Sequence, residues 1–281
     1  MNRPRSKVFL EGRYRKLSRD LPQTVFFCPV CKGHPRRRKG CERCEGFGKL
    51  SRDSVQELVG WVAGKAFGTR KNKFHGAGRE DVDVRMLGRG RPFVLELQDP
   101  KVFDVDLAAL EAEINRRNAG RLEVEGLHWS EKMRVALLKE THHAKEYEAL
   151  VEFEAPVAES AFHACLERRI DVVQRTPERV SHRRADKERE RWIELLAAEP
   201  AEDAAGGRRW RVRLRTQHGT YVKEVLSGEA GATVPSLGGL VGVPCVCLEL
   251  DVLAILDAEG SGEPPQKVRP PSFGAGLDAG G

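Results

Sequence analysis

Residues 75–97 read HGAGREDVDVRMLGRGRPFVLEL, and the two halves of this segment differ in character. The second half contains FVLEL at 93–97, an apolar run with the length and composition of a β-strand. The first half places acids and arginines between glycines, although a hairpin turn requires only a Gly and one Asp or Asn. A carboxylate at Asp81, beside Arg79 in a glycine-flanked loop at the mouth of a strand, suits a site that a ligand approaches closely. A salt-bridged surface loop explains this segment, taken alone, equally well.

Charge is distributed unevenly along the 281 residues. Forty-eight Lys and Arg outnumber 42 Asp and Glu, for a net charge of +6, and the excess is concentrated in residues 1–49. Such a segment attracts a polyanion, and nucleic acid is the leading candidate; a solvated basic tail is the alternative. No run approaches the roughly 20 apolar residues that span a bilayer, and the N-terminus lacks an apolar signal core. We therefore expect a cytoplasmic protein that makes no membrane contact.

Helices and strands are expected to follow one another irregularly along the chain. Ser54 and Glu57 have capping-box spacing ahead of an apolar helical face, and Asp106 is placed to cap a second helix. Apolar patterns predict the remaining elements, namely a helix at 158–170 and strands at 93–97, 147–153, 209–215 and 245–256. Because this order lacks regular β-α-β units, it favours an α+β fold with a mixed, largely antiparallel sheet flanked by helices.

Composition divides the chain into three regions. Residues 1–50 form a basic N-terminal segment, and within it residues 28–48 carry two cysteine pairs. Residues 51–257 contain the periodic apolar patterns and are expected to form the main folded domain. Residues 258–281 are rich in Gly, Pro, Ser and acids without periodicity, so we expect a disordered tail there.

Residues 28–48, CPVCKGHPRRRKGCERCEGFG, contain the same metal half-site twice. Each half is a Cys-x-x-Cys pair followed two residues later by Gly, which frees the backbone of a tight turn. Two such pairs supply four thiolates, a closed tetrahedral set that is typical of structural zinc. The sequence therefore predicts one zinc ion held by Cys28, Cys31, Cys41 and Cys44. Redox-active thiols are the alternative, and the Gly-rich context of both pairs disfavours it.

The loop between the two half-sites is strongly basic. It contains Arg36, Arg37, Arg38 and Lys39 in succession. A metal ion that anchors both ends of this loop would hold the four cations away from the rest of the chain. We favour contact with RNA phosphates over a merely solvated loop.

Three short motifs resemble those of pseudouridine synthases and occur in the same order: GRED at 78–81, KEYEALV at 145–151 and GTYVKE at 219–224. The first resembles the Gly-Arg-x-Asp motif of that family, whose Asp is the indispensable catalytic residue, which implies this role for Asp81. The second resembles the Lys-x-Tyr motif, whose tyrosine stacks on the base, which implies that Tyr147 stacks on it. The third resembles the motif whose basic residue pairs with the catalytic Asp, which implies Lys223.

Longer stretches narrow the resemblance to the archaeal and eukaryotic tRNA pseudouridine synthases that modify the T-loop uridines at tRNA positions 54 and 55. These stretches lie at 12–24, 74–97, 175–186 and 215–242, and the similarity extends from about residue 11 to 257. The cysteine knuckle also resembles archaeal members. The resemblance implies the pseudouridine synthase fold, with 51–257 as catalytic domain. Family members usually carry a further RNA-binding module upstream, and we expect this chain to be a form without it.

Isomerising uridine to pseudouridine is redox-neutral, so we expect no organic cofactor and tRNA as the substrate. The target base must leave its stack, and Tyr147 offers a face to hold it. Asp81 must stay ionised, as nucleophile or as the base that removes the C2′ proton, and Lys223 is the expected cation beside it. Arg79 is expected to position the backbone of the flipped nucleotide. Asp83 and Arg85 are expected to pair with each other or with loop neighbours.

A compact basic patch occurs further along the chain. His182, Arg183 and Arg184 are consecutive and suit contacts with phosphates. The main alternative to the enzyme is a zinc-containing RNA-binding protein without catalytic activity. The joint presence of Asp81, Tyr147 and Lys223 favours the enzyme.

Overall fold

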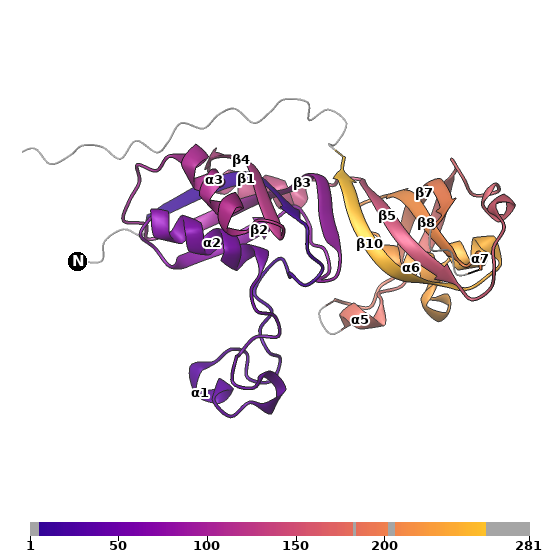
Figure 1. The fold of residues 1–281 in the computed structure, drawn as a ribbon, viewed down its shortest axis with the longest axis horizontal. Helices are drawn as coiled ribbons and strands as arrows, with labels where there is room; N and C mark the ends of the chain where they lie inside the picture. The colour runs from indigo at the N-terminus through magenta and orange to yellow at the C-terminus, as the bar shows by residue number, and fades with distance from the viewer. Residues whose placement is uncertain (1–5, 182–183, 202–205, 257–281) are drawn as a thin grey trace, which may run out of the picture.

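The computed structural model describes residues 6–181, 184–201 and 206–256. Within these residues, ten strands form one sheet that runs along the molecule (Figure 1). The strand order is β4-β1-β3-β10-β5-β8-β7-β6-β9, and β2 pairs with the C-terminal part of β3. The disordered tail predicted at 258–281 lies outside the described residues.

The sheet has two halves. The first half contains β1 (Lys7–Lys16), β2 (Lys71–Gly76), β3 (Arg85–Gln98) and β4 (Leu122–Ser130). The second half contains β5 (Lys145–Phe153), β6 (Arg169–Gln174), β7 (Arg189–Pro200), β8 (Arg209–Thr216), β9 (Thr233–Val234) and β10 (Cys245–Ile255). The α-helices are α1 (Pro35–Arg38), α2 (Val55–Ala66), α3 (Leu107–Arg117), α4 (Lys132–Glu140), α5 (Glu178–Ser181), α6 (Val222–Ser227) and α7 (Leu237–Val241).

The two halves meet where β3 pairs with β10. These two strands run parallel and pair only at Arg85–Asp251 and Met86–Val252. All other pairings between named strands of the described residues are antiparallel. The α+β fold with a mixed, largely antiparallel sheet is therefore confirmed, and the short parallel seam is the place where both halves contribute residues to one site.

β3 is longer than the strand predicted at 93–97, because it begins at Arg85. Gly88 has a φ of +56° and lies where the strand leaves β10. A Cβ atom at this position would lie 2.0 Å from the carbonyl oxygen of Leu253, so only glycine permits this approach. The charged half of the 75–97 segment is thereby divided, since residues 77–84 form a loop and the arginine-rich remainder belongs to the strand.

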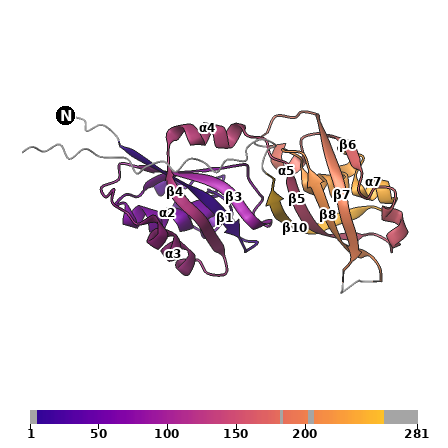
Figure 2. The same ribbon diagram turned by 90° about the horizontal axis from the view of Figure 1, so that it is seen from above.

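Helices cover both faces of the first half of the sheet. The predicted N-caps of two of them are confirmed: Ser54 Oγ accepts from the Glu57 N–H at 3.2 Å, and Asp106 Oδ1 accepts from the Ala108 N–H at 2.9 Å. Figure 2 shows α2 and α3 on one face of these strands and α4 on the other. Successive residues of β3 point to opposite faces of the sheet. Phe93 and Leu95 belong to the main core, whereas Val94 packs beneath α4.

The helix predicted at 158–170 is wrong. A single 3₁₀ turn spans Glu159–Phe162, and β6 begins at Arg169. The Phe162 ring is fully buried against Trp210, with ring centroids 4.6 Å apart. Glu167 then takes a positive φ of 53°. Packing of one aromatic ring, followed by strand pairing, therefore overrides the apolar spacing that suggested a helix.

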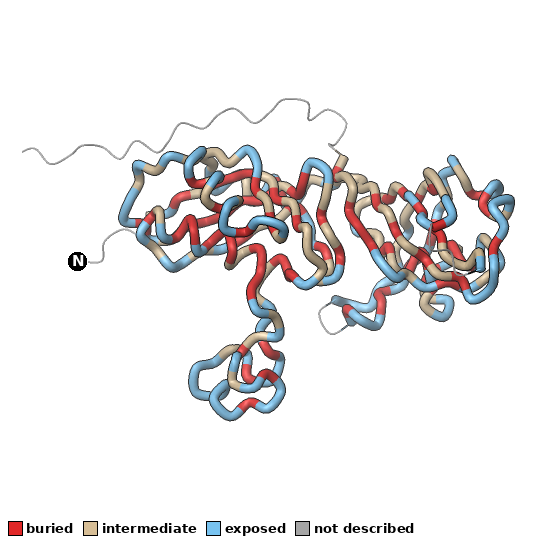
Figure 3. The backbone as a smooth tube through the Cα atoms, viewed as in Figure 1, coloured by how far each residue is buried: buried red, intermediate tan, exposed pale blue. Residues whose placement is uncertain are grey.

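The cysteine knuckle projects from the body on the same side as α5 (Figure 1). Its surface is largely exposed around a small buried centre (Figure 3). The buried residues of 28–48 are its four cysteines and Gly48. This segment therefore has no apolar core apart from the four thiols, and an ion held by them would stabilise it where apolar packing does not.

Candidate active site

A cavity of about 480 Å³ opens beside the seam between the two halves of the sheet. Its walls come from the 78–84 loop, β3, β5, α5, β7, β10 and the start of α6. Five of the residues predicted from the sequence line it: Arg79, Asp81, Tyr147, Arg184 and Lys223. The fold thus brings together side chains that are separated by up to 144 residues along the chain.

Asp81 lies in an ion pair with Arg179, which the sequence analysis did not single out. Arg179 Nη1 lies 2.5 Å from Asp81 Oδ2, and the two side chains are 35% and 30% exposed. The other side of the same guanidinium is held by Glu224, with Nε–Oε1 and Nη2–Oε2 distances of 2.5 and 3.0 Å. Burial disfavours the charge on Arg179, but Glu224 and Asp81 outweigh it and raise the Arg179 pKa. A permanent positive charge therefore stands beside the Asp81 carboxylate.

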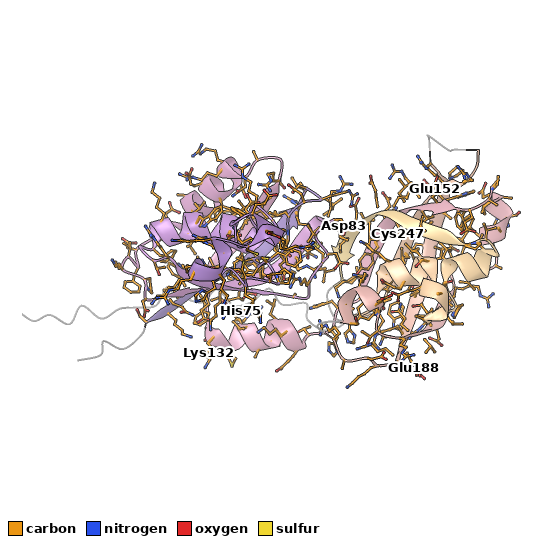
Figure 4. The ribbon with its side chains drawn as sticks, turned by 90° about the horizontal axis from the view of Figure 1, so that it is seen from below. His75, Asp83, Lys132, Glu152, Glu188 and Cys247 are labelled. Atoms are coloured by element: carbon orange, nitrogen blue, oxygen red, sulfur yellow. The ribbon has the colours of Figure 1, made fainter. Side chains whose placement is uncertain are left out.

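The predicted pairing of Lys223 with Asp81 is corrected by this geometry. Lys223 Nζ lies 2.7 Å from Asp83 Oδ2. Burial raises the pKa of Asp83, but Lys223 outweighs this effect, so the Asp83 pKa is lowered overall. Asp83 is at the junction of the two halves, close to Cys247 of β10 (Figure 4). Lys223 lines the cavity but neutralises a different carboxylate from the one expected.

The prediction that Asp83 and Arg85 pair with each other or with loop neighbours is also wrong. Arg85 binds Asp251 of β10 through two hydrogen bonds, with Nε–Oδ1 and Nη2–Oδ2 distances of 2.9 and 2.5 Å. These two residues are direct partners in the parallel pairing of β3 with β10. The ion pair therefore fastens the seam of the sheet and leaves Asp83 for Lys223.

A buried lysine holds the backbone of the 78–84 loop, which carries Asp81. Lys16 is 0% exposed, and its Nζ donates to the carbonyl oxygens of Leu21, Asp81 and Val82 at 2.8, 2.9 and 2.9 Å. Burial lowers the pKa of Lys16 to about 8, with Glu80 acting in the opposite direction. Two of the three acceptors belong to the loop that carries the Asp81 carboxylate, so this ammonium group fixes the position of that loop.

Glu80, next to Asp81, is buried in a separate polar network. The Tyr14 hydroxyl donates to Glu80 Oε1 at 2.8 Å, and Arg91 Nε lies 2.8 Å from Glu80 Oε2. Arg91 Nη1 also donates to the Ala77 carbonyl oxygen at 2.7 Å. The acids of the 78–84 loop therefore have three different positions: Glu80 is buried beneath the loop, Asp81 lines the cavity, and Asp83 binds Lys223. This separation explains why so many charges crowd ahead of one strand.

Tyr147, which its motif predicts to stack on the base, lines the cavity. It lies on β5 between Leu214 and Val252 of the neighbouring strands and is 9% exposed. Burial raises its pKa to about 12, so the hydroxyl is neutral. Tyr221, within the third motif, is a second aromatic residue of the cavity that the sequence analysis did not single out.

The predicted RNA-binding residues fall into two groups. The first group is exposed on the knuckle and consists of Arg36, Arg37, Arg38 and Lys39. Arg184 lines the cavity, whereas His182 and Arg183 lie outside the described residues.

The four predicted metal ligands converge in the knuckle. Cys28, Cys31, Cys41 and Cys44 place their sulfur atoms within 4.8 Å of one another. The Cys28–Cys41 and Cys31–Cys44 sulfur distances are 3.8 and 3.6 Å. Tetrahedral zinc with Zn–S bonds of about 2.3 Å requires sulfur separations of about 3.8 Å. The cluster can therefore hold a metal ion, and its dimensions fit zinc.

Among the described residues, no helix combines the length and apolarity needed to cross a membrane.

The family model and the related proteins match nearly the same length of this chain. The family model described as "Pus10, C-terminal" matches residues 9–256. A protein named tRNA pseudouridine synthase Pus10 from Methanothrix thermoacetophila is 47% identical over 249 residues, which are 88% of this chain and 53% of that protein. The protein of the same name from Methanothermobacter marburgensis is 44% identical over 250 residues, 88% of this chain and 60% of that protein.

The chain thus spans a little over half the length of these relatives. Among solved structures, a chain of the "Crystal Structure of a Cbf5-Nop10-Gar1 Complex" gives a TM-score of 0.39 at 20% identity, covering 70% of this chain and 44% of that one. Because the family model and the archaeal relatives cover nearly all of the described residues, this chain belongs to the Pus10 C-terminal family.

Proposed function

We propose that this chain is the catalytic part of a tRNA pseudouridine synthase, an isomerase that converts uridine in tRNA to pseudouridine. The observation that carries the proposal is the joint placement, in one cavity, of the Asp81 carboxylate, its counter-ion Arg179 and the Tyr147 ring. Family membership supports the same activity. A non-catalytic RNA-binding protein would have no need for a carboxylate paired with a cation at a cavity wall.

The reaction exchanges one glycosidic bond for another without oxidation or reduction. The target uridine leaves its stack and enters the cavity, where the Tyr147 ring supports the base. The N1–C1′ bond breaks, the base turns, and a C5–C1′ bond forms as C5 loses its proton and N1 gains one. Asp81 acts either as the nucleophile at C1′ or as the base that removes the C2′ proton. Arg179 places a positive charge directly beside the carboxylate that either route uses.

Isotope substitution separates the two routes. A tRNA carrying deuterium at C2′ of the target uridine should react more slowly in single-turnover measurements if Asp81 removes that proton. The rates of labelled and unlabelled tRNA should be nearly equal if Asp81 attacks C1′, because no C2′–H bond then breaks.

We further propose that the target lies in the T loop, at tRNA position 54, position 55 or both. The support is the resemblance of four stretches to enzymes of that specificity, at 12–24, 74–97, 175–186 and 215–242. The names of the archaeal relatives support tRNA as the substrate. The test is incubation with unmodified tRNA, followed by carbodiimide modification and primer extension, which reports activity and position together. No stop at any uridine would favour the RNA-binding alternative. Because tRNA is the proposed substrate, we expect the protein to act in the cytoplasm.

The knuckle is proposed to hold one structural zinc ion and to contact the RNA. Its exposed cations are Lys32, Arg36, Arg37, Arg38, Lys39 and Arg43, and none of them forms an ion pair within the described part of the chain. Phe27 and Phe47 expose 54% and 49% of their surface in and beside the same segment. Exposed rings interspersed with cations are typical of surfaces that bind unpaired nucleotides. The knuckle and α5 project from the same side of the body, so one RNA molecule could reach both (Figure 1).

A further inference from the structure

The cavity has more positive charge than the proposed chemistry uses. Its lining contains Arg79, Arg91, Lys145, Arg179, Arg184, Arg189, Arg191 and Lys223, against the acids Glu80 and Asp81. Three of these cations are neutralised by nearby carboxylates: Arg91 by Glu80, Arg179 by Asp81 and Glu224, and Lys223 by Asp83. Arg189 and Arg191 of β7 differ from these three, because no carboxylate of the described residues lies within 4.0 Å of either guanidinium.

Arg191 retains unused hydrogen-bonding capacity. Its Nη1 donates to the carbonyl oxygen of Glu190 at 2.6 Å. Its Nε is buried and has no hydrogen-bond partner among the described residues. A Cβ atom at Gly219 would lie 3.5 Å from Arg191 Nη2, so the guanidinium lies directly against the glycine of the GTYVKE motif. An unpaired buried donor is unfavourable, and a ligand that accepts a hydrogen bond from it removes this penalty.

Arg189 is held in place by neutral acceptors. Its Nη1 donates to Thr176 Oγ1 and to the Lys187 carbonyl oxygen, both at 2.8 Å. Its guanidinium lies 5.7 Å from the centre of the Tyr221 ring. The carboxylate that feels its charge is Asp186, but Arg175 already binds both oxygens of that group, at 3.0 and 2.6 Å. The position of Arg189 is therefore fixed while its charge is left without a direct partner in the described part of the chain.

Neighbouring groups report the same local excess of positive charge. The pKa of His218 is lowered, first by burial and then by the adjacent His142, Arg191 and Lys145. The pKa of Lys145 is lowered to about 8, first by burial and then by Arg91. Each of these groups would hold its proton more tightly if an anion entered this part of the cavity.

We propose that Arg189 and Arg191 form a phosphate subsite that binds the phosphodiester backbone at the flipped nucleotide. The two side chains are two residues apart on β7 and therefore point to the same face, with backbone positions about 6.6 Å apart. Arginine suits this ligand because its planar fork donates two parallel hydrogen bonds to one phosphate. The subsite rests on the proposed function and identifies the part of the RNA that this wall recognises.

The first test measures binding of an unmodified tRNA transcript as a function of salt. The variants are Arg189→Gln and Arg191→Gln, and the matched control is Arg211→Gln on the neighbouring strand β8, whose side chain is 53% exposed and lies 3.7 Å from Glu148. Each subsite variant should weaken binding about tenfold, as expected when a charge-assisted hydrogen bond is removed. The slope of log K against log salt should fall by about 0.7 for each phosphate of a single-stranded region that the variant no longer neutralises. The control should match the wild type in both quantities.

The second test locates the phosphate. A tRNA is ligated from two pieces so that one methylphosphonate, which has no charge, replaces the phosphate on the 5′ or the 3′ side of the target uridine. The wild type should bind one of these two RNAs more weakly than the unsubstituted tRNA. Arg191→Gln should bind that RNA and the unsubstituted tRNA equally well, because the variant and the methylphosphonate remove the two partners of one contact. An excess of inorganic phosphate should not reproduce this positional effect, which separates an RNA phosphodiester from a free phosphate ion.

Arg191→Lys covers the case in which the glutamine variant does not fold, because it keeps the charge while losing the fork. It should retain the salt slope but bind more weakly than the wild type. The proposal would be overturned if the β7 variants had the same affinities and salt slopes as Arg211→Gln. It would also be overturned if the affinity losses caused by the variant and by the methylphosphonate were additive. Binding is scored separately from pseudouridine formation, so an inactive wild type would contradict the synthase assignment while the affinities and slopes still test the subsite.

Discussion

Lys16 offers a direct test of how the catalytic loop is held. Lys16→Met keeps an unbranched apolar stem but removes the ammonium group, so the carbonyl oxygens of Leu21, Asp81 and Val82 each lose a donor. At about 1 kcal/mol for each buried acceptor, the lower end of the usual range, the loss is about 3 kcal/mol of folding free energy. For a domain of this size, that corresponds to a fall in Tm of about 6–12 °C.

Activity should respond more strongly than binding. If the loop moves by about 1 Å, the misplaced carboxylate reduces kcat by about 100-fold. KM for tRNA changes less, because most of the proposed RNA contacts, on the knuckle and on β7, lie outside this loop. The control is Lys65→Met, since Lys65 is exposed on α2. Thermal unfolding and single-turnover pseudouridine formation are measured at a temperature where both variants are folded. A Lys16→Met protein with the Tm and kcat of the control would refute the anchoring role.

Three further predictions concern the ring, the metal and an ion pair. Tyr147→Phe should retain most activity because the stacking face remains. Tyr147→Leu should lose about 1–3 kcal/mol of stacking, measured as a lower kcat/KM. Equal losses of kcat/KM in both variants would assign the effect to the hydroxyl instead. Purified protein should contain one zinc per chain, and chelation should expose the knuckle to trypsin while the main domain resists. A Cys28→Ser/Cys41→Ser double variant that retains the metal would contradict this ligand set. Glu11, which binds Arg134 at 2.6 Å, has a lowered pKa because Arg134 and Ser130 outweigh the effect of burial. A carboxyl whose folded-state pKa is lowered stabilises above its ordinary value of 4.5 and loses that contribution as pH falls through the folded-state pKa. The wild type should therefore exceed Glu11→Gln in unfolding free energy by about 2 kcal/mol, constant near neutral pH. This difference should shrink below pH 4.5, and a difference that grows in acid would contradict a lowered Glu11 pKa.

Elements with local signals were predictable from the sequence. The caps at Ser54 and Asp106 define two helices without reference to the rest of the chain, since a side chain near the helix start satisfies the first free N–H groups. The cysteine pairs define the knuckle in the same way, because ligand type and spacing are written in one short segment. The strands at β5, β8 and β10 were also indicated by their apolar patterns.

Elements that depend on long-range pairing were not predictable. The parallel register of β3 and β10 places Asp251 beside Arg85, and nothing local indicates that partner. This pairing leaves Asp83 to Lys223, so Arg179 from a distant four-residue helix becomes the counter-ion of Asp81. The resemblance misassigned the partner of Asp81, because packing between distant elements determines which cation lies there.

Arg189 and Arg191 were missed for a related reason. In the sequence they belong to a charged run, KERERW at 187–192, which has the composition of a solvated surface. Alternation along β7 sends Glu190 to the outside and the two arginines to the cavity. The alternation of arginine and glutamate at 188–191 indicated a strand with two different faces. Only the position of β7 in the sheet shows that the arginine face lines the cavity.

The most direct test of the account is to compare wild type and Asp81→Asn on the same unmodified tRNA. The substitution changes one atom type and removes a negative charge, while Arg179 keeps its contacts with Glu224. We expect the wild type to form pseudouridine in the T loop, and the variant to form none while binding tRNA as tightly as the wild type. Pseudouridine formed by Asp81→Asn, or loss of binding together with activity, would contradict the assignment of Asp81 as the catalytic residue.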